Sequence, residues 1–144
     1  MRHNLQGMGQ IPLTVPPQPA VQPATQFYEE PGDLVLDKVL TANQEALRQA
    51  VQVDEDSDFL LLALVGNSTS TYNIVLYQAN NRAVNSAYAK NTNYVGSANF
   101  PVPLLKELYY PAGASIRVDV KDTSGAGNTI QLIFKGIRRY RLAA

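Results

Sequence analysis

The chain has 144 residues and a mass of 15.8 kDa, which is the size of a single domain. Its twelve Lys and Arg residues balance its twelve Asp and Glu residues, so no net charge attracts it to nucleic acid or to an anionic membrane. There is no Cys, and the single His is His3, which excludes disulfides, thiol nucleophiles and Cys-based zinc sites. The sequence has neither the ~18 apolar residues of a membrane-spanning helix nor the pattern of a signal peptide.

The first 31 residues are rich in proline. Six of the nine prolines of the chain lie there: Pro12, Pro16, Pro17, Pro19, Pro23 and Pro31. Proline fixes the backbone φ angle and cannot donate a hydrogen bond to a neighbouring strand. We therefore predict an extended, polyproline-like arm over residues 1–31. At ~3.1 Å per residue, such an arm can reach beyond its own subunit.

Two interpretations of this arm remain open. It is either a solvated, disordered tail or a segment that becomes ordered on a neighbouring molecule. The second interpretation is favoured by apolar residues that a solvating tail does not need. These residues are the predicted interface residues of the arm: Ile11, Leu13, Val15, Phe27 and Tyr28.

From residue 32 onward, the sequence has the pattern of short β-strands. Apolar and polar residues alternate over 34–40, 72–77, 116–120 and 130–135. A continuous apolar run of strand length covers 59–65, and a further candidate strand, 104–110, lies between prolines. Clusters of Gly, Pro, Asn and Ser separate these segments, as turns require. We predict an all-β domain over residues 32–144, folded as an antiparallel β-sandwich.

Two segments do not follow this pattern clearly. Residues 41–50 have good helix propensity, but Leu47 and Val51 also suit a strand, so a helix and a turn followed by a strand both remain open. Residues 80–99 are small and polar, without sustained periodicity. A loop of this length in a compact domain is usually functional or packed against a partner.

One acidic segment has the beginning of a calcium-binding loop. Its carboxylates occupy positions one, three and five, at Asp54, Asp56 and Asp58. A calcium loop requires Gly at position six and Glu at position twelve, and this chain has Phe59 and Val65 there. The pattern therefore indicates a solvated acidic turn before a buried strand.

No motif in the chain predicts catalysis. The single His lies near the start of the chain, in the predicted arm, where no packed wall would hold it for a catalytic triad. The sequence contains no G-x-S-x-G motif, and the glycines at 125 and 127 lack the Lys-Ser/Thr pair of a phosphate-binding loop. We predict that the protein is not an enzyme and that it needs no metal or cofactor.

Charge is segregated along the chain even though the total is zero. Residues 29–58 contain nine acids and two bases, whereas residues 59–144 contain three acids and nine bases. The bases are densest at Arg138, Arg139 and Arg141, which are predicted interface residues. Such complementarity suits contacts between copies of the chain, in which charge fixes the register.

Aromatic residues in the long loop are also predicted interface residues. Tyr88 and Tyr94 lie within 80–99, and Tyr supplies a large rigid surface with a polar tip. Packing in the core is the alternative for either residue.

Several stretches resemble small structural proteins of tailed bacteriophage virions. The resemblance is carried by YPAG at 110–113, DTSGAGN at 122–128 and IQLIFKG at 130–136, and to a lesser degree by LTANQ at 40–44 and DSDF at 56–59. It covers residues 34–140. It implies a jelly-roll-like sandwich that decorates or cements a capsid, often as a trimer, and it implies no catalytic residues.

The sequence therefore predicts a capsid decoration or cement protein. The expected partners are the major capsid protein and other copies of this chain, in a homotrimer or another ring, and the expected location is the capsid surface after synthesis in the host cytoplasm. Nucleic acid, membrane and small-molecule substrates are not expected. Two alternatives remain: a neck, collar or tail component, and a glycan- or receptor-binding module on the virion.

Overall fold

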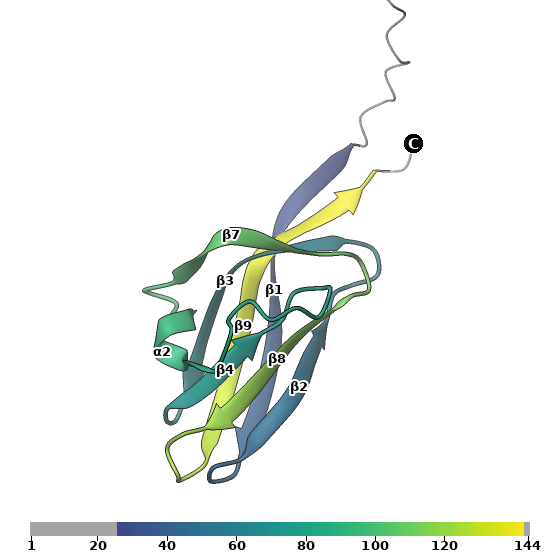
Figure 1. Ribbon diagram of the computed structural model, residues 1–144. Coiled ribbons are helices and arrows are strands. Elements are labelled where there is room, and N and C mark those ends of the chain that lie inside the picture. Colours follow the sequence, from purple (N-terminus) through teal and green to yellow (C-terminus); the bar gives the residue numbers. More distant parts are fainter. Residues whose placement is uncertain (1–25, 143–144) are drawn as a thin grey trace, which may run out of the picture.

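The computed structural model describes residues 26–142, and these residues fold as a β-sandwich (Figure 1). The strands range in length from 2 to 14 residues. They are β1 (Phe27–Leu40), β2 (Glu45–Gln52), β3 (Asp58–Ser68), β4 (Tyr72–Leu76), β5 (Ala89–Lys90), β6 (Val95–Gly96), β7 (Val102–Tyr110), β8 (Ser115–Asp122) and β9 (Asn128–Arg141). One helical turn, α2 (Asn91–Tyr94), interrupts them. Within residues 26–142 no helix has the length and apolar character needed to cross a membrane.

The strands form two sheets that face each other. The first sheet has the order β1-β9-β3-β6, and β7 also pairs with β3. The second sheet has the order β2-β8-β4-β5. All pairs are antiparallel except β3 with β6. Because the chain crosses from one sheet to the other after each of β1, β2 and β3, the two sheets are bound together by the chain itself.

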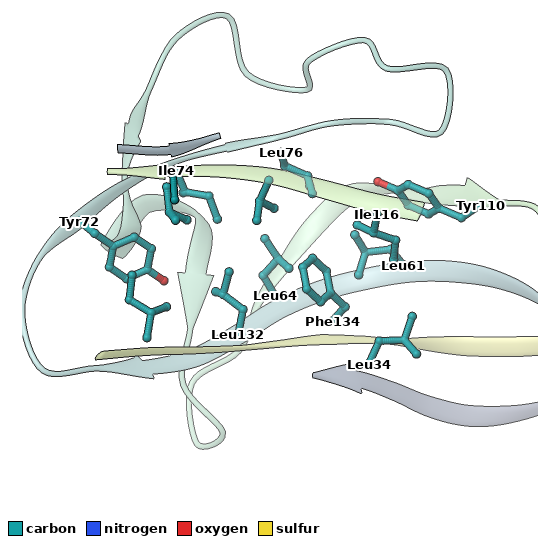
Figure 2. Close-up of a cluster of buried hydrophobic side chains, with 14 of the residues drawn as sticks. Leu34, Leu61, Leu64, Tyr72, Ile74, Leu76, Tyr110, Ile116, Leu132 and Phe134 are labelled. Carbon is teal, nitrogen blue, oxygen red and sulfur yellow. The ribbon is translucent and has the colours of Figure 1, made fainter. Parts of the chain in front are cut away.

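The core lies between the two sheets and is built from the inward-facing residues of both (Figure 2). The bulkiest buried side chains are Phe59, Tyr72, Tyr110 and Phe134. Around them pack aliphatic residues, including Leu34, Leu61, Leu64, Ile74, Leu76, Ile116 and Leu132. In β1, Leu34 and Leu40 are buried, whereas Val35 and Val39 are exposed, as a strand with one face on the core requires.

The predicted all-β antiparallel sandwich is confirmed, but its first strand begins earlier than the sequence indicates. Residues 27–31 belong to the predicted arm, yet they form the start of β1 and pair with the end of β9. Leu142 donates its backbone N–H to the carbonyl of Gln26. Because hydrogen-bonded and non-hydrogen-bonded pairs alternate along an antiparallel ladder, the even-numbered residues of β1 bond to β9 and Pro31 does not. The missing N–H of Pro31 therefore faces the outer edge, where it costs no ladder bond.

The two ambiguous segments are also resolved. Residues 41–44 form a turn, closed by the bond from the Gln44 N–H to the Thr41 carbonyl, and β2 follows it. The interpretation as a turn and strand is therefore correct, and the helix is not formed. Residues 80–99 contain the short elements β5, α2 and β6, which lie against β4 and β3.

Candidate assembly interface

The ends of β1 and β9 continue as a two-stranded ribbon past the body of the sandwich (Figure 1). Two predicted interface residues, Phe27 and Tyr28, lie on this ribbon and are about half exposed. The ring of Tyr28 stacks on Tyr140 at a centroid distance of 4.9 Å, and the Arg139 guanidinium lies 5.2 Å from the ring centre of Phe27. These cross-strand contacts hold the ribbon together and leave part of each ring open to solvent.

Antiparallel pairing of β1 with β9 brings the acidic N-terminal segment next to the basic C-terminal one. The Arg139 side chain lies 2.9 Å from the Glu29 carboxylate, and Lys135 Nζ lies 3.2 Å from Asp33. Arg138 contributes a third, looser pair at 3.7 Å, with Asp54. These three pairs neutralise part of the segregated charge within one chain.

The three predicted basic interface residues therefore differ from one another. Arg138 and Arg139 make ion pairs inside the chain, and each keeps about a third of its side chain exposed. Arg141 is exposed at the tip of the ribbon and makes no ion pair among residues 26–142. Exposed ion pairs of this kind contribute ~0–1 kcal/mol each, so they set the register of the ribbon more than its stability.

The two predicted tyrosines of the long loop are both used inside the fold. The Tyr88 hydroxyl donates a 2.7 Å hydrogen bond to the Glu45 carboxylate and ties the loop to β2. Burial is the main cause of the raised pKa of Tyr88, and this bond adds to it. Tyr94 is half-buried and packs against the core cluster. Tyr94 therefore fits the alternative of core packing, Tyr88 makes its bond at the surface, and the role of both as interface residues stays a prediction.

An apolar groove that the sequence did not predict lies beside β7. It has a volume of about 510 Å³. We call it the β7 groove, and its lining residues are Val84, Asn93, Tyr94, Val102, Pro103, Leu104, Leu105, Lys106 and Leu108. At its rim, Leu105 is fully exposed and Val102 is 39% exposed, and nearby Phe100 is 79% exposed. Exposed apolar side chains gathered in one place are typical of surfaces that contact another molecule.

The local backbone explains why β7 leaves such a groove. The register of β7 on β3 shifts between Leu61 and Ala63, and β6 takes the place beside β3 at Leu64. Gly96 allows this arrangement, because a Cβ there would lie 2.5 Å from the Phe100 carbonyl oxygen and the Val102 nitrogen. Reciprocal backbone bonds of 3.1 Å between Ser97 and Phe100 then close the turn and carry Phe100 outward.

Polar clusters elsewhere in the described chain have structural roles. Asp119 is buried, accepts a 2.7 Å bond from the Arg48 N–H and a 2.6 Å bond from the Tyr77 hydroxyl, and stabilises the bulge in β2. Hydrogen bonding to Asp119 is the largest cause of the raised pKa of Tyr77. Within residues 26–142 no group of three or more His, Cys, Asp or Glu side chains is placed to hold a metal ion.

The candidate surface thus consists of the β7 groove and the tip of the β1–β9 ribbon. These two regions contain four of the predicted residues: Phe27, Tyr28, Tyr94 and Arg141. The predicted residues Ile11, Leu13 and Val15 lie outside the described residues. Residues 104–110 are predicted as a strand, and the adjacent apolar residues Leu104 and Leu105, which point to opposite faces of a strand, were the signal that could have indicated an exposed surface.

Comparison with known protein families found no matching family, and comparison with curated proteins found no match. Among solved structures, the chain is similar to one described as a Bacillus endospore appendage from a family of disulfide-linked pili. The identity is 14%, the alignment covers 86% of this chain and 97% of that chain, and the TM-score is 0.37. A similarity this distant carries no information about function.

Proposed function

We propose that this protein is a structural component of a bacteriophage virion that decorates or cements the capsid. The observation that carries the proposal is the exposed apolar surface at Phe100, Val102 and Leu105. A chain of this size rarely maintains such a surface unless another protein covers it. The sequence resemblance at 110–113, 122–128 and 130–136 supports the same class of protein.

The proposed mechanism is mechanical. Many copies would bridge neighbouring subunits of the major capsid protein, and each copy would add a modest contact energy. Because linked contacts act in parallel, the shell gains stability well beyond the affinity of any single contact. In this proposal the protein acts on the outer surface of the virion, and other copies of the chain are its second partner.

The N-terminal segment gives the proposal a direct test. Since β1 begins at Phe27, a deletion of residues 1–25 removes the proline-rich segment and leaves every described strand intact. We expect purified virions that carry this truncated protein to retain fewer copies than virions with the full chain. Quantitative mass spectrometry of the particles measures the occupancy. Unchanged occupancy would show that the segment is a passive tail.

Copy number separates the proposed function from a role in the neck, collar or tail. A decoration protein is present in roughly hundreds of copies, whereas a ring in the neck or tail has about a dozen or fewer. We expect the larger number. In addition, particles that lack the protein are expected to lose their DNA at a lower temperature than complete particles. A small copy number together with unchanged heat resistance would contradict the proposal.

A further inference from the structure

We propose that the β7 groove binds residues 11–15 of a second copy of this chain. This inference deepens the proposed function, because it names the contact that links copies to one another, but its test needs no capsid. It begins from the chemistry of the groove. Apart from Asn93 and Lys106, every residue that lines it is apolar, and it has room for several aliphatic side chains.

The N-terminal segment has the complementary chemistry. Residues 11–15 read IPLTV, so Ile11, Leu13 and Val15 alternate with smaller or more polar residues. Bound as a β-strand, in which alternate side chains point to the same side, the segment can place all three in one groove. No charged residue lies between Gln10 and Gln26, and therefore no charge would be desolvated on binding.

The prolines lower the cost of binding. Pro12 lies between Ile11 and Leu13, Pro16 follows Val15, and both restrict the backbone to extended conformations. A segment that is already extended loses less conformational entropy when it binds than a flexible one does. Grooves with an aromatic residue in the wall suit proline-rich segments, and Tyr94 lines this one.

The path of the chain favours a second copy over the same copy. The arm joins the sandwich at Gln26, which is hydrogen-bonded to Leu142 at the end of β9. The groove lies at Pro103, and the strand pairings place Pro103 opposite Ala63 and Ala63 opposite Lys135 of β9. This separation is seven residues along β9, or ~24 Å, and three strand spacings across the sheet, or ~14 Å. The straight path is therefore ~28 Å.

Residues 16–25 span ~31 Å in a polyproline-like conformation and ~33–36 Å when fully extended. Moreover, β1 runs toward the body from the tip of the ribbon, so a chain that precedes Gln26 leaves the ribbon pointing away from the body and must reverse its direction to reach the groove (Figure 1). To reach its own groove, the segment would have to use most of this length and also turn sharply at Gln26. A neighbouring copy imposes no such condition.

Cysteine cross-linking tests this placement in the full-length protein, because the chain has no Cys of its own. One chain carries Leu13→Cys, and the other, distinguished by a purification tag, carries Leu105→Cys. Leu105 is fully exposed, so this change leaves the core intact. The matched control pairs Leu13→Cys with Leu47→Cys, since Leu47 is also an exposed leucine but lies on β2, in the other sheet.

After mild oxidation, we expect a disulfide-linked heterodimer with Leu105→Cys at least tenfold more abundant than with Leu47→Cys. Adding Ile11→Ser and Val15→Ser to the Leu13→Cys chain is expected to abolish the difference. Equal yields, or no heterodimer at high protein concentration, would overturn the inference. A double variant, Leu13→Cys with Leu105→Cys, that closes within single chains on dilution would show that the occupant is the same copy.

The outcome is independent of the capsid proposal. Cross-linking in purified protein combined with no occupancy on virions would retain the groove assignment and reject the capsid role. Occupancy on virions without cross-linking would retain the capsid role and reject the groove assignment.

Discussion

Asp122 shows at the scale of one residue how the sandwich closes its turns. The residue is only 1% exposed, and its carboxylate accepts six hydrogen bonds, from Asn43, Ser124 (two bonds), Gly125, Gly127 and Asn128. The bond from the Ser124 hydroxyl is the largest cause of the strongly lowered pKa of Asp122. One carboxylate therefore joins the β8–β9 turn to the β1–β2 turn.

We predict that Asp122→Asn lowers the urea midpoint of unfolding at about pH 6 and that this deficit narrows at about pH 2.5. Because the folded-state pKa is lowered, the carboxylate stabilises the fold above the unfolded pKa of ~3.9 and loses this contribution as the pH falls below it. Urea titrations followed by circular dichroism measure the difference. Asp37→Asn, which removes an exposed carboxylate bonded to Gln131, is the control and should have little effect. A deficit that is the same at both pH values would contradict this account.

At the scale of elements, close backbone contact between strands depends on Gly136. A Cβ there would collide with the carbonyl oxygen of Leu60 and lie 2.7 Å from the ring of Phe59. Gly136→Ala is therefore expected to lower the free energy of unfolding by about 3 kcal/mol, because the β3–β9 pair must shift. Thermal and urea unfolding measure this loss.

The cross-strand partner of Gly136 provides the control. Gly32 lies opposite it in the β1–β9 pair, and a Cβ there would meet only the flexible side chain of Arg138, at 2.8 Å. Gly32→Ala should cost less than ~1 kcal/mol, since that side chain can move. Equal losses in the two variants would show that strand propensity, and not the contact with Leu60, determines the effect.

The sequence predicts the strands of the sandwich better than it predicts the candidate interface. The strands follow from local alternation, as in 130–135, because one face of each strand lies on the core. The start of β1 was missed because Pro31 reads as part of the arm, and only the pairing with β9 shows that its edge tolerates proline. The β7 groove was not predictable, since Val84, Tyr94 and Leu105 come from separate segments that only the fold brings together.

At the scale of the whole molecule, the pairing of charges determines how copies can meet. A sequence with acids at 29–58 and bases at 135–141 suggests that copies attract one another head to tail. In the folded chain, however, Glu29, Asp33 and Asp54 pair with bases of the same chain. These three acids are therefore already paired within the chain, and the contact proposed above for a second copy is the apolar β7 groove.

We therefore predict that self-association is insensitive to salt. Raising NaCl from about 0.05 to about 0.5 M shortens the screening length from ~13 to ~4 Å, which weakens contacts between exposed charges and leaves apolar contacts unchanged or slightly stronger. Sedimentation velocity of the full chain, and the yield of the heterodimer formed by Leu13→Cys with Leu105→Cys, should change by less than twofold over this range. A tenfold loss would mean that charges, with Arg141 at the tip of the ribbon the first to test, join the copies instead of the groove.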